Sequence, residues 1–301
     1  MIKDKTAAMK EKHPVLLCLM VVLLVEAAMW GVKGSMFLAG FGNDGSNLYL
    51  MVRELLYCGL GLASLKILNL TRIFKETKNF WRTFLSAGLV LMIIILSCFT
   101  FFPDISGDYK SVAEIVSLPI FILAIGFFEE TVFRGIVINL LADRFCRSVK
   151  GVWATAAISG SIFGMVHIVN VFAGQTLQDT IVQVIQISFF GILLGAIYLK
   201  NRNIYSMMLL HALYDGSRMI AAGLNNGWSI MDPDGSGSDD LKKVIILNII
   251  YCSMYLIATA VVIRPKAARK IAGISKDGDK IKGKKNKGRK AEISVENSSL
   301  R

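Results

Sequence analysis

Apolar runs long enough to cross a bilayer dominate the sequence. They lie at residues 15–32, 47–68, 83–103, 115–141, 151–172, 181–199, 204–223 and 244–263, eight runs in all. A bilayer-spanning helix needs about 20 mostly apolar residues, and only helices and closed barrels satisfy every backbone polar group inside lipid. No strand-like alternation stands out, and the mean hydropathy of +0.54 excludes a soluble domain of this size. The sequence therefore predicts an all-α, polytopic membrane helical bundle of about eight transmembrane helices over residues 1–263.

Basic residues set the predicted orientation of this bundle. Lys and Arg gather before the first run and in every second connection after it, whereas the alternate connections carry Asp with few bases. Because short loops rich in Lys and Arg stay in the cytoplasm, both termini of this multi-pass protein are predicted to be cytoplasmic, in the cell (plasma) membrane. The loop at 232–240, DPDGSGSDD, has Lys243 where a calcium-binding loop needs Glu, so it is interpreted as an acidic linker.

The last 38 residues, 264–301, differ in composition from the rest of the chain. They hold thirteen Lys or Arg and four acids, which accounts for +9 of the net charge of +12. This segment is predicted to be a disordered cytoplasmic tail, either bound to anionic lipid headgroups or solvated and fixing the topology. No nucleic acid is expected, because no aromatic residue interleaves the bases. The five cysteines lack paired spacing, so no disulfide is predicted.

Three charges lie in the middle of the run 115–141: Glu129, Glu130 and Arg134. A charge at the centre of a membrane helix costs roughly 2.5–3.5 kcal/mol, which favours a function. Glu130 and Arg134 are four residues apart and are predicted to form an ion pair along one helix face. Glu129 lies about 100° around the helix from Glu130, so it needs another partner or a catalytic task.

Two further features of the apolar runs are interpreted structurally. Glu26 and Arg53 lie at similar depths in the first two runs, and we expect them to form an ion pair because each alone is costly there. GxxxG spacings at 160–164 and 191–195 are interpreted as close helix packing.

Two of the three histidines, His167 and His211, lie in apolar runs, and the third is His13 near the start. Asp215 follows His211 by one turn and is placed to orient its imidazole. With Glu129 as the base, these groups suit hydrolysis, which needs activated water, oxyanion support and an acid for the leaving amine. Zinc stays possible, since two histidines and a carboxylate can hold it, but the same residues can act without a metal.

The heights of the two histidines in the membrane pose a difficulty. Counted from the predicted cytoplasmic ends, His167 lies about sixteen residues up its run and His211 about seven, a nominal difference of roughly 13 Å. Helix tilt, unequal helix ends or a broken helix is therefore required if both residues serve one site.

Three motifs appear in order on separate apolar runs: EETVFR (129–134), FGMVH (163–167) and HALYD (211–215). Together they resemble the EExxxR, FxxxH and HxxxN/D motifs of the CAAX-protease and bacteriocin-processing family of intramembrane endopeptidases. The resemblance covers about residues 115–223. It implies a bundle of about eight helices with its catalytic groups in an intramembrane cavity.

The resemblance also implies roles for the individual residues. Glu129 and His167 would activate water, and His211 with Asp215 would support the oxyanion. The candidate catalytic residues, with the pair predicted above, are Glu129, Glu130, Arg134, His167, His211 and Asp215. The third motif ends in Asp where the prenyl-protein-processing members have Asn.

The expected function is therefore cleavage of a membrane-anchored or membrane-proximal peptide by activated water. The alternative is a non-catalytic membrane immunity or scaffold protein of the same fold. A proton-coupled transporter ranks third, because the inverted repeats or Gly/Pro-broken runs that such a protein shows are not seen.

Overall fold

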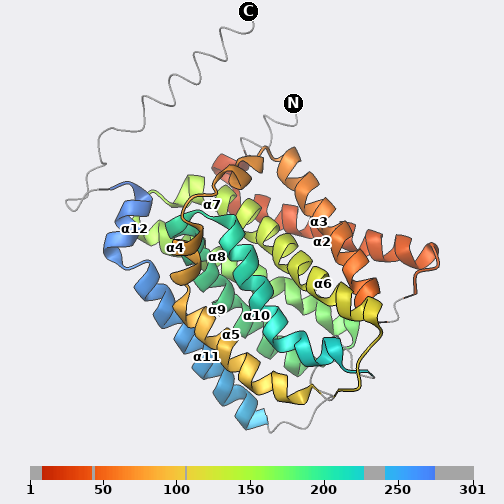
Figure 1. The fold of residues 1–301 in the computed structure, drawn as a ribbon. Coiled ribbons are helices and arrows are strands. Elements are labelled where there is room, and N and C mark those ends of the chain that lie inside the picture. Colours follow the sequence, from red (N-terminus) through yellow and green to blue (C-terminus); the bar gives the residue numbers. More distant parts are fainter. Residues whose placement is uncertain (1–8, 43–44, 106, 227–240, 275–301) are drawn as a thin grey trace, which may run out of the picture.

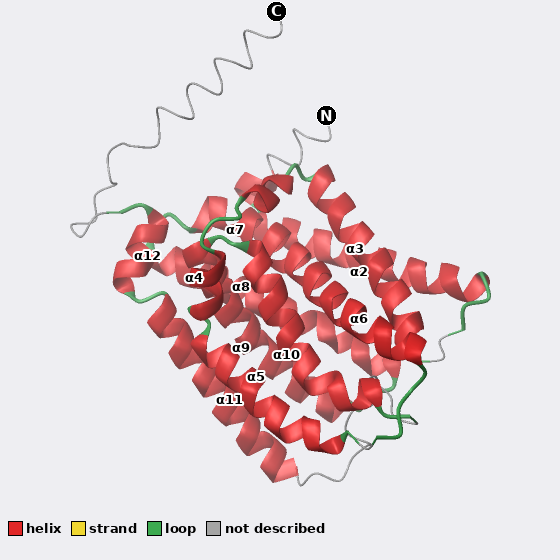
Figure 2. Cartoon of the chain, in the orientation of Figure 1, coloured by secondary structure: helices red, strands yellow, loops and turns green. Residues whose placement is uncertain are grey.

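The computed structural model describes residues 9–42, 45–105, 107–226 and 241–274. Its elements in chain order are α2 (Pro14–Leu38), α3 (Asn47–Ile67), η1 (Thr71–Lys75), α4 (Phe80–Leu85), α5 (Gly88–Phe101), η2 (Phe102–Asp104), α6 (Val112–Glu130), η3 (Thr131–Val137), α7 (Ile138–Phe145), α8 (Val149–Met165), η4 (Val166–Ala173), α9 (Leu177–Asn201), α10 (Ile204–Leu224), α11 (Leu241–Val262) and α12 (Pro265–Ala272). No strand occurs in these ranges, as Figure 2 shows. The predicted all-α fold is confirmed.

Each of the eight predicted runs contains a helix. Six helical segments are long and apolar enough to cross a membrane: Pro14–Leu38, Asn47–Ile67, Val112–Phe145, Val149–Ala173, Leu177–Asn201 and Val244–Val262. The other two runs correspond to α5, which has 14 residues, and to α10, which has 21 residues and carries the polar third motif. The chain is thus a multi-pass membrane protein, and the predicted count of eight spanning helices is approximate.

The long helices lie side by side, with α6 and α10 between α11 on one edge and α2 and α3 on the other (Figure 1). Loops predicted to share a side of the membrane are joined by hydrogen bonds. The side-chain amide of Asn203 donates to the carbonyl of Lys78 at 3.0 Å, and the amide of Asn225 donates to the carbonyl of Asp104 at 2.7 Å. These two contacts agree with the predicted sides of the four loops that they join, while the side that faces the cytoplasm stays a prediction.

Glycines allow the helices around the motifs to approach closely. A Cβ added to Gly191 of α9 would lie 2.7 Å from the ring of Phe163 and 3.0 Å from Cα of Gly160 on α8. The packing role of the two GxxxG spacings is thus confirmed. A Cβ on Gly126 of α6 would lie 2.5 Å from the carbonyl oxygen of Met208 on α10. The missing side chain of Gly126 therefore allows α6 and α10 to approach closely one turn before Glu129.

The predicted ion pair between Glu26 and Arg53 is wrong. Arg53 lies 3.7 Å from Glu54, its neighbour on α3, and no ion pair joins it to Glu26 in the described ranges. The charge of Glu26 interacts instead with Lys33, two turns further along α2. Each charge therefore has a partner on its own helix, and the sequence interpretation had considered neither Lys33 nor Glu54.

The tail predicted to be disordered begins with a helix. Residues Pro265–Ala272 form α12, whose Ala268 is buried while Lys266 and Lys270 are exposed. One apolar face packs on the bundle and stabilises the helix despite its charges. The rest of the tail and the acidic linker at 232–240 lie outside the described residues. All five cysteines are free.

Candidate active site

The two acids of the first motif end α6, and a π-helix, Thr131–Val137, follows them directly. A π-helix shifts the backbone hydrogen bonds by one residue, and such segments occur often at functional sites. The amide of Asn139 donates to the carbonyl oxygens of Arg134 and Gly135, at 2.9 Å each. This side chain satisfies carbonyls at the point where the hydrogen-bond register changes, and so stabilises the π-helix beside the acids.

Glu130 and Arg134 form the predicted ion pair. The distance between Glu130 Oε1 and an Arg134 guanidinium nitrogen is 2.9 Å, and the side chains are 0% and 1% exposed. Arg134 also donates to the carbonyl of Gly191 at 3.2 Å and lies over the ring of Phe163. Glu130 makes a second contact that sequence reasoning missed, since the same Oε1 lies 2.7 Å from Nδ1 of His211. Glu130 therefore binds both Arg134 and the imidazole of His211, and holds the two side chains in place.

His211 lies at the centre of three carboxylates. Its Nε2 is 3.3 Å from Glu129 Oε2 and 3.4 Å from Asp215 Oδ2, while Nδ1 faces Glu130. The side chain of Glu129 is 24% exposed and that of Asp215 is 18% exposed, whereas Glu130 is sealed. Glu129 thus has the separate partner that its position required, and it is the carboxylate most open to a water molecule or a substrate.

His167 lies near the same site, in a segment where the helix type changes. Helix α8 ends at Met165, and His167 lies in the 3₁₀ segment η4, with Nδ1 3.0 Å from the carbonyl oxygen of Phe163. Because a carbonyl only accepts, Nδ1 donates this bond and Nε2 is left as an acceptor. The ring of Phe163 packs edge-on against both His167, at 5.4 Å, and His211, at 5.7 Å. The two histidines therefore contact one aromatic ring, despite the nominal difference in their heights along the helices.

The three motifs lie in one segment that matches a known family. Residues 111–217 match the family model described as Type II CAAX prenyl endopeptidase Rce1-like. This segment is Rce1-like. The resemblance stated from the motifs is thereby confirmed for these residues, which extend from the start of α6 into α10. No curated protein and no solved structure matched the chain.

The Rce1-like site does not fit the zinc centre that the sequence left open. Within the described ranges, no group of three or more His, Cys, Asp or Glu side chains is arranged to hold a metal ion. Both ring nitrogens of His211 face carboxylate oxygens, so neither is directed at an open coordination position. We therefore derive no catalytic step through zinc.

Another acid lies beside the site but outside the Rce1-like segment. Glu54 of α3 has a side chain that is 7% exposed, and its charge interacts with those of Asp215 and Glu129. Sequence reasoning missed it, although a buried acid in an apolar run is the same signal that singled out Glu129. The charged site thus receives residues from α3 as well as from α6 and α10.

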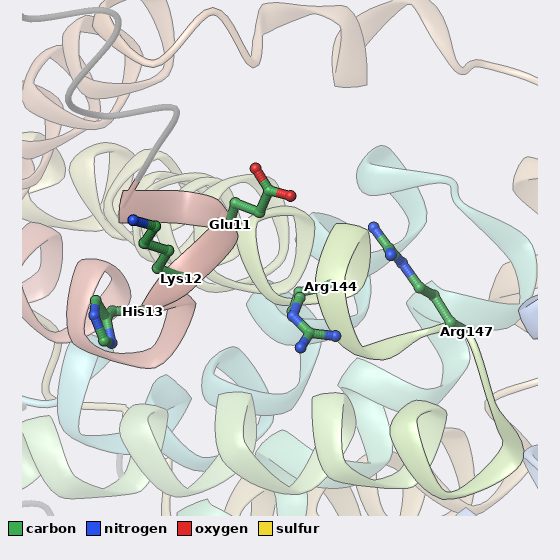
Figure 3. A pocket seen from close by; sticks show the side chains of 5 residues that line it. All are labelled: Glu11, Lys12, His13, Arg144 and Arg147. Atoms are coloured by element: carbon green, nitrogen blue, oxygen red, sulfur yellow. The ribbon is translucent and has the colours of Figure 1, made fainter.

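A surface hollow at one end of the bundle has a different character. It is lined by Glu11, Lys12 and His13, where α2 begins, and by Arg144 and Arg147, where α7 ends (Figure 3). None of the six candidate catalytic side chains lines this hollow. The third histidine of the chain therefore lies at the surface and is not part of the candidate site.

Proposed function

We propose that this protein is an intramembrane endopeptidase that hydrolyses a membrane-anchored or membrane-proximal peptide. One observation carries the proposal: Glu129, in the span Val112–Phe145, contacts His211 and is the most exposed of the three carboxylates around that imidazole. A carboxylate in a membrane span is costly to the stability of the fold, so its presence beside an imidazole favours a catalytic role. The Rce1-like match supports the assignment to a protease class.

In this proposal, Glu129 and His167 activate the attacking water. The water donates a proton to the carboxylate of Glu129, and Nε2 of His167 accepts its other hydrogen bond, since Nδ1 is committed to Phe163. The water oxygen then attacks the peptide carbonyl carbon. General-base assistance of this kind contributes roughly 10²–10⁴-fold to a rate. The proton held by Glu129 is passed to the leaving amine when the C–N bond breaks.

His211 and its neighbours support the negative charge that develops on the carbonyl oxygen. Nδ1–H of His211 donates a hydrogen bond to Glu130, so the imidazole presents Nε2–H on the side of Glu129 and Asp215. Once Glu129 has taken up a proton, Nε2–H is available to donate to the oxyanion, and Asp215 keeps the imidazole charged. Arg134 holds Glu130 in place from the buried side. Positioned donors of this kind are typically worth 10²–10³ in rate.

The experiment that tests the proposal is a cleavage assay with the full chain in liposomes. A library of peptides carrying either a lipid anchor or a single membrane span is incorporated, and products are identified by mass spectrometry. The proposal expects defined new termini close to the membrane, absent from liposomes containing the His211→Ala variant. If the wild-type chain gives no more cleavage than empty liposomes, the protein is not a peptidase of this kind, and the scaffold alternative takes its place.

A further inference from the structure

A second charged pair borders the candidate site from a helix that the family match does not cover. Arg53 and Glu54 lie on α3, before the Rce1-like segment begins at residue 111. Their closest charged atoms are 3.7 Å apart, which is long for an ion pair, and the side chains are 12% and 7% exposed. Tyr57, one turn further along α3, packs against Phe128, the neighbour of Glu129, with their ring centres 5.7 Å apart. This face of α3 therefore lies next to the proposed catalytic groups.

The hydrogen-bonding capacity of Arg53 is incompletely used. Its Nε is buried and has no hydrogen-bond partner, and its guanidinium lies 5.7 Å from the ring centre of Tyr57, which restricts its orientation. A buried, unpaired donor on a charged group is costly and therefore calls for an explanation, which a bound group can supply. Arg134 also has a buried Nε without a partner, but its side chain is only 1% exposed and out of a substrate's reach.

Among the charged side chains around the proposed site, Glu129, Asp215 and Arg53 are 24%, 18% and 12% exposed, whereas Glu54, Arg134 and Glu130 are 7% exposed or less. Two of the three more exposed side chains are acids, so a peptide carboxylate would be repelled from the catalytic groups themselves. Arg53 offers such a carboxylate a cation on the α3 side of the site. A guanidinium suits this task because its planar donors match the two oxygens of a carboxylate.

We propose that Arg53 forms a subsite for a carboxylate of the peptide substrate, next to the bond that is cleaved. This inference rests on the proposed endopeptidase function and deepens it, because it names a chemical feature of the substrate. The carboxylate has two possible sources, the free C-terminus of the peptide and an Asp or Glu side chain. Glu54 contacts the same guanidinium, with their closest charged atoms 3.7 Å apart.

The test measures binding, so that it does not depend on turnover. The full chain carrying Glu129→Gln is placed in nanodiscs, and three fluorescein-labelled apolar hexapeptides are titrated: one with a free C-terminus, one C-terminally amidated, and one amidated with an internal Asp. Arg53→Gln is added as the test variant and Arg53→Lys as the conservative one. Lys66→Gln, which removes an exposed cation near the other end of α3, is the matched control.

The subsite predicts that Arg53→Gln weakens binding of a carboxylate-bearing peptide by about tenfold or more. Binding of the fully neutral peptide should stay unchanged, Arg53→Lys should restore part of the difference, and Lys66→Gln should have no effect. The peptide that responds identifies the source of the carboxylate. Because Arg53→Gln leaves Glu54 without its partner, the double variant Arg53→Gln/Glu54→Gln is measured too and should show the same loss of selectivity.

Equal weakening for charged and neutral peptides, or no preference for a carboxylate in the parent protein, would overturn the subsite. Failure of the proposed function looks different. In that case, wild-type liposomes cleave nothing, while the binding titration still reports whether Arg53 distinguishes carboxylate from amide.

Discussion

Replacing Arg134 by Ala should destabilise the fold strongly, because it leaves Glu130 buried without its cation. The two side chains are 1% and 0% exposed, and the distance between their charged atoms is 2.9 Å. Removing one partner of a buried ion pair costs about 3–5 kcal/mol, since the remaining charge stays in a low-dielectric interior. The carbonyl of Gly191 loses a donor as well. The sum is a large part of the 5–15 kcal/mol by which a typical protein is stable.

The assay is thermal unfolding of the purified full chain in detergent, read as a double-mutant cycle. Arg134→Ala, Glu130→Gln and the double variant are compared with the wild type. Glu130→Gln should partly rescue Arg134→Ala, with a coupling energy within the 0.5–3 kcal/mol usual for residues in contact. Arg147→Ala, at an exposed position, is the control and should leave the melting temperature nearly unchanged. An Arg134→Ala protein as stable as the wild type would refute the reasoning.

Three other changes test separate parts of the structure. Gly126→Ala should cost about 1–3 kcal/mol of stability and reduce cleavage, because its Cβ would push α10 away from α6; Gly59→Ala, with nothing within 4 Å, should do neither. Asn139→Leu should remove a side-chain donor from two backbone carbonyls of the π-helix and lower stability by about 1–3 kcal/mol, measured by the same unfolding assay. In a cysteine-free background, a membrane-impermeant maleimide should label Ser106→Cys in sealed cells but leave Arg147→Cys unlabelled; the opposite pattern would invert the topology.

The sequence predicted the helical bundle because its signals are local and strong. Long apolar runs leave the backbone few alternatives in a bilayer, and each predicted run contains a helix. The ion pair between Glu130 and Arg134 was predictable for the same reason, since helix geometry alone places residues four apart on one face. The glycine spacings likewise indicated where α8 and α9 approach.

Contacts between helices, in contrast, depend on rotation and on local departures from α-helical geometry. The 3₁₀ segment that carries His167 and the π-helix after Glu130 have no plain sequence signal. The contact of Glu130 with His211 follows from how α6 and α10 face each other, and helical spacing does not give it. The proposed pairing of Glu26 with Arg53 failed because equal depth in two helices does not make their side chains face each other.

The identity of Glu129 as the general base is the central claim, and the rate of a single turnover after Glu129→Gln tests it most directly. The substitution keeps the size of the side chain and its position beside His211, while removing its ability to accept a proton. With a membrane-anchored peptide that the wild type cleaves, the single-turnover rate should fall by roughly 10²–10⁴-fold, with an unchanged melting temperature. A Glu129→Gln protein that folds like the wild type and cleaves at the wild-type rate would contradict the account.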